Sequence, residues 1–287
     1  MSAKLEVISP DLCSPETRTS IILSHSTEKG GVGKTTIEYN QAYRLAEQGK
    51  RVLIINFDGQ RNMDKTVLGG DNQAVQQAES GFTSANLFDP ATKLENVRVL
   101  QSPLHENIHL IPTHKANIAT VNSIGRSEAQ SLILNPAKLI YCLDYDYIII
   151  DTPPSLGVTQ MSALATVDKL YIPVMIEDFS AEGLESLLKT VQGLKVNLNC
   201  KVELAGIYIN CFEKPTTRIG HNPEKELLDS LEARYKGYLI TPYIPRGKYV
   251  KEARMNGLPA WKNTPNGGAA VVGRKVKASI DAMNERL

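Results

Sequence analysis

The chain lacks several features that would place it in a special class of protein. No window approaches the roughly eighteen uncharged apolar residues of a membrane-spanning helix, so none is expected. Residues 1–18 lack the apolar centre of a secretory signal peptide. No CxxC or other close cysteine pair occurs, which argues against a disulfide scaffold or zinc site and favours a reducing cytoplasm. The cysteines are Cys13, Cys142, Cys200 and Cys211.

The net charge of +1 identifies no partner, but the distribution of charge is informative. Hydrophobic residues make up 42 % and charged residues 22 %, as in ordinary globular proteins. Residues 246–277 hold eight Lys or Arg and one acid, which leaves 24 basic and 30 acidic residues elsewhere. A mildly acidic body therefore carries a basic stretch near its C-terminus.

Short apolar runs alternate with amphipathic segments along the chain, which is typical of βαβ units. The pattern predicts one α/β domain over residues 19–287, with a single doubly wound, mostly parallel sheet and helices on both faces. Residues 1–18 are expected to form a flexible N-terminal arm. Strands are predicted at 21–23, 51–57, 108–111, 147–150, 169–174, 204–210 and 238–240. Helices are predicted at 35–48, 71–79, 127–142, 181–196 and 268–286.

A glycine-rich segment lies between the first predicted strand and the first predicted helix. Its end, Gly33-Lys34-Thr35, matches the P-loop pattern G-x-x-x-x-G-K-[ST], although Glu28 replaces the opening glycine. Backbone N–H groups of such a loop cradle phosphates, Lys34 would reach the β- and γ-phosphates, and Thr35 would offer its hydroxyl to Mg²⁺. ATP and Mg²⁺ are therefore the expected ligands. The predicted nucleotide-binding residues here are Gly30, Gly31, Val32, Gly33, Lys34, Thr35 and Thr36.

The stretch KGGVGKTT, which begins at Lys29, resembles the deviant Walker A box of the ParA/MinD family of ATPases. The resemblance runs from about residue 20 to the end of the chain and is closest to small, Soj-like ParA partition proteins. In that family the early lysine reaches across a dimer interface to the nucleotide of the other subunit. The resemblance assigns this catalytic role to Lys29 beside Lys34, and it implies a homodimer in the ATP state.

Two aspartates at strand ends complete the site that the resemblance implies. Asp58 matches the second aspartate of the family's D-x-D motif, which positions the attacking water, whereas Asn56 replaces the first. Asp151 follows three isoleucines, as a Walker B aspartate does, and would hold Mg²⁺ through water. The predicted metal site is therefore Thr35, Asp58 and Asp151. Asn56 and Glu28 depart from the family pattern, so slow unaided hydrolysis is expected.

The resemblance also implies a site for the base. Asn210 matches a position that reads adenine, and Pro245 lies in a segment that resembles the loop covering the base. An asparagine could pair with the adenine edge through both of its amide groups.

The basic C-terminal stretch favours binding to a phosphate backbone without base contacts. Its final helix carries an apolar stripe, most simply packed on the body, and its basic residues come early, against the preference of the helix dipole. The arm of 18 residues is too short for a separate DNA-reading domain, so non-specific DNA is the expected partner. The predicted DNA-binding residues are Arg246, Lys248, Lys251, Arg254, Arg274, Lys275 and Lys277.

The leading hypothesis is a nucleoid-associated, cytoplasmic ATPase for DNA partition, released from DNA when a ParB-like partner stimulates hydrolysis. A MinD-like membrane-associated positioning ATPase is the main alternative. An electron-transfer ATPase would need cysteine ligands near the switch regions, which the sequence does not offer. A ligase that phosphorylates a small carboxylate stays open because of Asn56.

Overall fold

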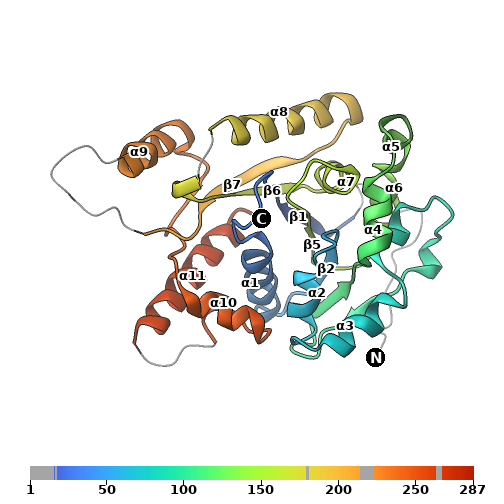
Figure 1. Cartoon of the computed structure of the whole chain (residues 1–287), viewed down its shortest axis with the longest axis horizontal. Coiled ribbons are helices and arrows are strands. Elements are labelled where there is room, and N and C mark those ends of the chain that lie inside the picture. The colour runs from blue at the N-terminus through green and yellow to red at the C-terminus, as the bar shows by residue number, and fades with distance from the viewer. Residues whose placement is uncertain (1–15, 17, 179–180, 214–222, 263–266) are drawn as a thin grey trace.

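The computed structural model describes residues 16, 18–178, 181–213, 223–262 and 267–287. They contain one eight-stranded sheet in the order β3-β4-β2-β5-β1-β6-β7-β8 (Figure 1). Neighbouring strands are parallel except the edge pair β3 and β4. The strands are β1 Ile21–His25, β2 Val52–Asn56, β3 Leu100–Gln101, β4 Ile108–Ile111, β5 Tyr147–Asp151, β6 Lys169–Val174, β7 Glu203–Ile209 and β8 Leu239–Ile240.

Continuous apolar runs in the central strands supply two separate cores, one on each face of the sheet. In β5, Ile148 and Ile150 belong to one apolar cluster, whereas Ile149 between them belongs to the other. Successive side chains of a strand point to opposite faces, so a strand covered on both sides must be apolar throughout. All three isoleucines are fully buried. The expected doubly wound α/β architecture is confirmed.

Helices cover both faces of this sheet (Figure 1). Helices α1, α2, α3, α10 and α11 contribute to one apolar cluster, and α4 to α9 contribute to the other. On the first face they are α1 Lys34–Glu47, α2 Asn62–Val67, α3 Asn72–Glu79, α10 Lys248–Met255 and α11 Gly268–Asn284. On the second they are α4 Lys115–Asn122, α5 Arg126–Leu132, α6 Asn135–Ile140, α7 Val158–Thr166, α8 Ala181–Leu198 and α9 Pro223–Tyr235.

The predicted strands and four of the five predicted helices agree with the structure to within two residues at each end. The single helix predicted at 127–142 is wrong, because the chain forms α5 and α6 there. Pro136 lies in the first turn of α6, where its missing N–H costs nothing, but it cannot continue a preceding helix. Helices α2, α4, α7, α9 and α10 were not predicted, and neither was the antiparallel edge strand β3.

The N-terminal arm falls mostly outside the described residues, and its flexibility stays a prediction. Where the chain is described, Arg18 forms an ion pair with Asp168, and Glu16 forms one with Lys201 at 2.7 Å. Cys142 is disulfide-bonded, which the cysteine spacing did not predict. None of the helices in the described part of the chain is both long and apolar enough to span a membrane.

Candidate functional site

A cavity of about 410 Å³ lies against the glycine-rich loop and the start of α1. The residues after β2 and β7 line it as well, and α10 forms another part of its wall. The carboxyl ends of parallel strands meet at one edge of a sheet, which is where doubly wound proteins bind their ligands. The cavity therefore occupies the expected binding position of this fold.

Two glycines give the loop its shape. Gly31 and Gly33 have φ of 80° and 84°, a left-handed conformation that other residues rarely adopt. A Cβ on Gly33 would also lie 2.3 Å from Nδ2 of Asn210, which itself donates a hydrogen bond to the carbonyl of Val32 at 2.7 Å. Gly33 caps α1 without a side-chain hydrogen bond, so the first N–H groups of this 14-residue helix can meet an anion.

Lys34, Thr35 and Asp151 come together at the base of the cavity. Lys34 is only 7 % exposed, although it begins a helix and lines the cavity. The hydroxyl of Thr35 donates a hydrogen bond to Oδ2 of Asp151 at 3.1 Å. Asp151 is the last residue of β5 and is fully buried. The hydroxyl of Thr35 and the carboxylate of Asp151 both offer oxygen atoms as metal ligands. This pair suits Mg²⁺, which prefers oxygen ligands and retains several waters.

A second buried carboxyl group, Glu38, supports Asp151. Glu38 lies one turn after Thr35 in α1, is fully buried, and accepts a hydrogen bond from the N–H of His25 at 2.9 Å. Burial, together with the neighbouring charge of Asp151, raises the pKa of Glu38 well above its ordinary range. Burial also raises the pKa of Asp151 to about 6, against the hydrogen bond that Glu38 gives it. Glu38 is therefore the more readily protonated member of this buried pair, and Asp151 the more readily ionised one.

Asp58 lies two residues beyond β2 and lines the cavity. Its N–H donates to Oδ1 of Asn56 at 2.8 Å, and its own Oδ1 accepts from the N–H of Gln60 at 2.9 Å. Burial raises the pKa of Asp58, while the Gln60 hydrogen bond and the charge of Lys34 oppose the rise. The carboxylate is thereby held on a tight turn, facing the space beside Lys34.

Asn56 has a structural partner that the sequence did not reveal. Its Nδ2 donates to Oδ1 of Asp64 at 2.8 Å, and the N–H of Thr113 donates to Oδ2 at 3.0 Å. Both Asn56 and Asp64 are fully buried. Burial raises the pKa of Asp64 to about 7, against these two hydrogen bonds. Asn56 therefore links the buried carboxyl group of Asp64 to the backbone of Asp58.

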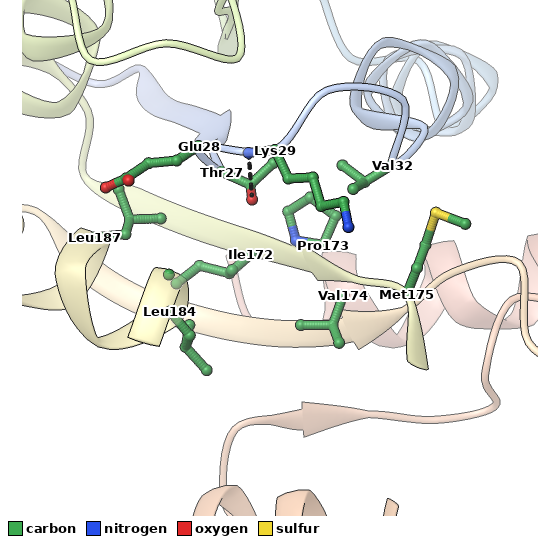
Figure 2. A pocket seen from close by; sticks show the side chains of 11 residues that line it. Thr27, Glu28, Lys29, Val32, Ile172, Pro173, Val174, Met175, Leu184 and Leu187 are labelled. Carbon is green, nitrogen blue, oxygen red and sulfur yellow. Dashed lines mark hydrogen bonds between the residues drawn. The ribbon is translucent and has the colours of Figure 1, made fainter. Parts of the chain in front are cut away.

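Lys29 does not line the cavity that contains Lys34. It lines a second, more apolar cavity of about 230 Å³ between the loop, β6 and α8. Figure 2 shows its side chain extending towards Val32 and Met175, while Glu28 points the opposite way, towards Leu187. The backbone N–H of Lys29 donates to the hydroxyl of Thr27 at 3.3 Å. Lys29 is exposed, in a position where another molecule could reach it.

Glu28, which replaces the opening glycine of the P-loop pattern, fastens the loop to α8. Its Oε1 accepts a hydrogen bond from the hydroxyl of Ser186 at 3.1 Å. A charged side chain is therefore accommodated at this position without entering the cavity of Lys34.

Asn210 and Pro245, the residues expected to meet adenine, both line the cavity of Lys34. One amide proton of Asn210 is already donated to Val32, so its oxygen and remaining proton are left for a base. Pro245 bridges to Phe212, which links the segment after β8 to the end of β7. These contacts join segments far apart in the sequence on one side of the cavity.

The seven residues predicted to bind DNA do not form one surface. Arg246 forms ion pairs with Glu177 at 2.6 Å and Glu213 at 3.2 Å. Lys251 and Arg254 line the cavity of Lys34 instead. The other four predicted residues are exposed or partly exposed on the outer parts of α10 and α11. They are Lys248, Arg274, Lys275 and Lys277.

Comparisons with known proteins find similar sequences over most of the chain. A family model described as an AAA domain matches residues 20–204. The chain is 31 % identical to the sporulation initiation inhibitor protein Soj of Bacillus subtilis, over 88 % of this chain and 94 % of Soj. It is also 31 % identical to the chromosome-partitioning ATPase Soj of Treponema pallidum, over 81 % of this chain and 85 % of that protein.

Solved structures with low sequence identity share the fold. A plasmid partition protein of Borrelia burgdorferi bound to AMPPNP matches with a TM-score of 0.71 at 20 % identity, covering 93 % of this chain and all of that one. Cobyrinic acid a,c-diamide synthase from Mycobacterium smegmatis, with an ATP analogue and magnesium, matches with a TM-score of 0.63 at 24 % identity. That match covers 83 % of this chain and 91 % of the synthase.

Proposed function

This chain belongs to the ParA/MinD family of P-loop ATPases, and we propose that it is an ATP-driven switch for partitioning or positioning a DNA cargo. The observation that carries the proposal is the convergence of Lys34, Thr35 and Asp58 on one cavity, with Asp151 hydrogen-bonded beneath them. Relatives that share nearly a third of its residues are named as chromosome-partitioning proteins.

The cavity suits a magnesium nucleoside triphosphate. Loop amides and Lys34 would hold the phosphates, and Asn210 and Pro245 would meet the base. Thr35 would contact Mg²⁺ directly and Asp151 through water, since Mg²⁺ retains much of its hydration in proteins. When bound, the ion supplies positive charge next to the phosphate oxygens.

Lys34 and Asp58 have different roles in hydrolysis. Lys34 neutralises charge on the phosphates, while Asp58 orients the attacking water. Asn56 and Gln60 fix the direction of the Asp58 carboxylate through the backbone contacts described above. We expect turnover to be slow in the isolated chain and faster with a ParB-like partner.

A second copy of the chain would complete the site. Lys29 lies on an exposed loop and lines a different cavity from Lys34, so its charge does not serve its own nucleotide in this conformation. In a dimer, Lys29 of one subunit would reach the nucleotide of the facing subunit. There it would stabilise charge on the phosphate oxygens, as an arginine finger does. ATP would thus favour a dimer in which each subunit supplies Lys29 to the other.

The dimer would bind DNA through the four basic residues at the surface of α10 and α11. Clustered cations attract a phosphate backbone regardless of base sequence. The membrane alternative is less favourable, because the apolar stripe of α11 is already used: Val276, Ile280 and Met283 are fully buried against the body. A helix whose apolar face is packed in the core cannot also insert that face into a bilayer.

Retention of the protein on random DNA with ATP or ADP tests the proposal. We expect wild type to be retained with ATP and released with ADP, and retention with ATP to fall steeply as salt rises. Lys34→Ala should lose the dependence on nucleotide. Equal retention with the two nucleotides would contradict the proposal, and retention on anionic liposomes in place of DNA would support the membrane alternative.

A further inference from the structure

Helix α10 lines the nucleotide cavity along one of its faces. The residues that reach the cavity are Gly247, Val250, Lys251 and Arg254, a spacing that places them on one side of a helix. Ala253, on another side, is fully buried. Eight residues of α-helix span about 12 Å, so α10 extends from the Pro245 region towards the phosphate-binding end.

Arg254 is a cation with no ion-pair partner among the described residues. It is partly buried, and its Nε is inaccessible to solvent yet has no hydrogen-bond partner in the described part of the chain. Among the described residues no carboxylate lies within ion-pair distance of it, although the charge of Asp151 is near enough to influence it. Burial lowers its pKa, but a guanidinium stays protonated in proteins. A buried charge of this kind is costly unless something pairs with it.

The backbone that carries Arg254 is held firmly against α1. The hydroxyl of Tyr39 donates to the carbonyl of Gly257, and the N–H of Ala260 donates to Oδ1 of Asn40 at 2.8 Å. Gly257 has φ of 64°, and a Cβ there would lie 2.1 Å from a methyl group of Leu104. Arg254 therefore projects from an anchored helix, as a residue that positions a ligand should.

The missing anion is best supplied by the nucleotide. Lys34, Lys251 and Arg254 face the cavity with Asp58 as the carboxylate on its wall, so the cavity favours a ligand with several negative charges. Helix α10 packs on both α1 and α2, and α2 follows directly after the Asp58 turn. This packing brings the end of α10 to the part of the cavity where the terminal phosphates would lie.

We propose that Arg254 is a ligand of the terminal phosphates of ATP, contributed by the C-terminal part of the chain, rather than a DNA contact. This inference rests on the proposed nucleotide site. It assigns to α10 a direct role in distinguishing ATP from ADP. A bidentate guanidinium–phosphate contact provides both charge and geometry for that distinction.

Equilibrium titration of MgATP and MgADP into the full chain tests the inference. Arg254→Gln should weaken ATP binding by roughly tenfold or more, as expected for loss of a hydrogen bond to a charged group, and ADP binding by clearly less. Arg254→Lys keeps the positive charge but cannot make the bidentate contact of a guanidinium, so it should lose part of the preference for ATP. The matched control is Arg234→Gln on α9, whose arginine pairs with Glu185 at 2.8 Å and lies outside the cavity.

Thermal unfolding with and without nucleotide separates a ligand contact from a structural role. If Arg254 binds phosphate, the rise in Tm on adding MgATP shrinks in Arg254→Gln. Should that variant fail to fold, the ratio of ATP to ADP affinity in Arg254→Lys decides. An unchanged ratio in the folded variant overturns the inference. Failure of wild type itself to bind MgATP would instead overturn the proposed nucleotide site.

Discussion

The ends of β5 and β2 lie side by side in the sheet, yet they hold their aspartates in different ways. Asp151 is part of β5, pairs in register with Asn56, and is fully buried between Thr35 and Glu38. Asp58 lies beyond its strand on a turn and is only partly buried. The strand holds the carboxylate of Asp151 in one position, whereas the turn allows the carboxylate of Asp58 to move when a ligand binds.

This difference assigns separate tasks to the two carboxylates. A carboxylate locked in a strand and hydrogen-bonded to the P-loop threonine is suited to holding a metal in one geometry. A carboxylate on a turn, supported through Asn56 and Gln60, is suited to activating water only when the nucleotide is in place. Binding and hydrolysis should therefore be separable by mutation.

The largest expected effect is on turnover in Asp58→Ala. The variant should lose roughly 10²- to 10⁴-fold in ATPase rate, the usual contribution of a positioned acid–base group, while its affinity for ATP changes little. Single-turnover hydrolysis beside equilibrium nucleotide binding measures both quantities. Loss of affinity as large as the loss of rate would remove the distinction between the two strand ends.

Asp151→Asn should show the opposite pattern. Groups that hold a metal through water typically contribute about 10- to 100-fold to affinity, so the Mg²⁺-dependent part of ATP binding should fall by that amount. Titration of Mg²⁺ at fixed nucleotide measures the effect, and binding without Mg²⁺ serves as the internal control. Unchanged Mg²⁺ dependence would show that Asp151 is not part of the metal site.

Stability should reveal how the Asp58 turn is supported. Asn56→Asp would place a second carboxylate against buried Asp64, and we expect it to lower the free energy of unfolding by about 3 kcal/mol. Asn56→Asp combined with Asp64→Asn restores one carboxylate and one amide, so it should recover most of the loss. Denaturant unfolding of the two single variants and the double variant gives the coupling energy. An additive double variant would contradict the proposed contact.

Asp64 should also make the free energy of unfolding depend on pH. Asp64 has its pKa raised to about 7 in the folded chain, above the ordinary value of 3.8 that the unfolded chain would have. The folded state therefore holds an extra proton between these values, and stability from this group falls as pH rises from about 4 to 7, by at most about 1.4 kcal/mol per pH unit. Asp64→Asn should flatten the slope in this window. An identical slope would show that other groups cause it.

Much of the fold followed from local pattern, and most of the helices that were missed are short. Runs such as Ile148–Ile150 marked central strands because both faces of the sheet are covered. Short helices such as α7 and α10 were missed because tertiary packing, rather than sequence periodicity, stabilises helices of eight or nine residues. The final helix was predicted, and its stripe packs on the body as expected.

The sequence by itself determined the phosphate loop, because its geometry depends on neighbouring residues alone. Gly31 and Gly33 supply the backbone conformation, and the helix that follows supplies the free N–H groups. Strand-end aspartates could be proposed as well, since parallel strands deliver their carboxyl ends to one edge.

Only the tertiary structure decided which distant residues share the cavity. Asn210 donates to the carbonyl of Val32 in a loop 178 residues earlier, Asn56 donates to buried Asp64, and Arg254 lines the cavity of Lys34. None of these contacts leaves a mark on local composition or periodicity. They arise because packing of helices on a sheet brings together side chains that chain order keeps apart, and burial then changes what each charge can do.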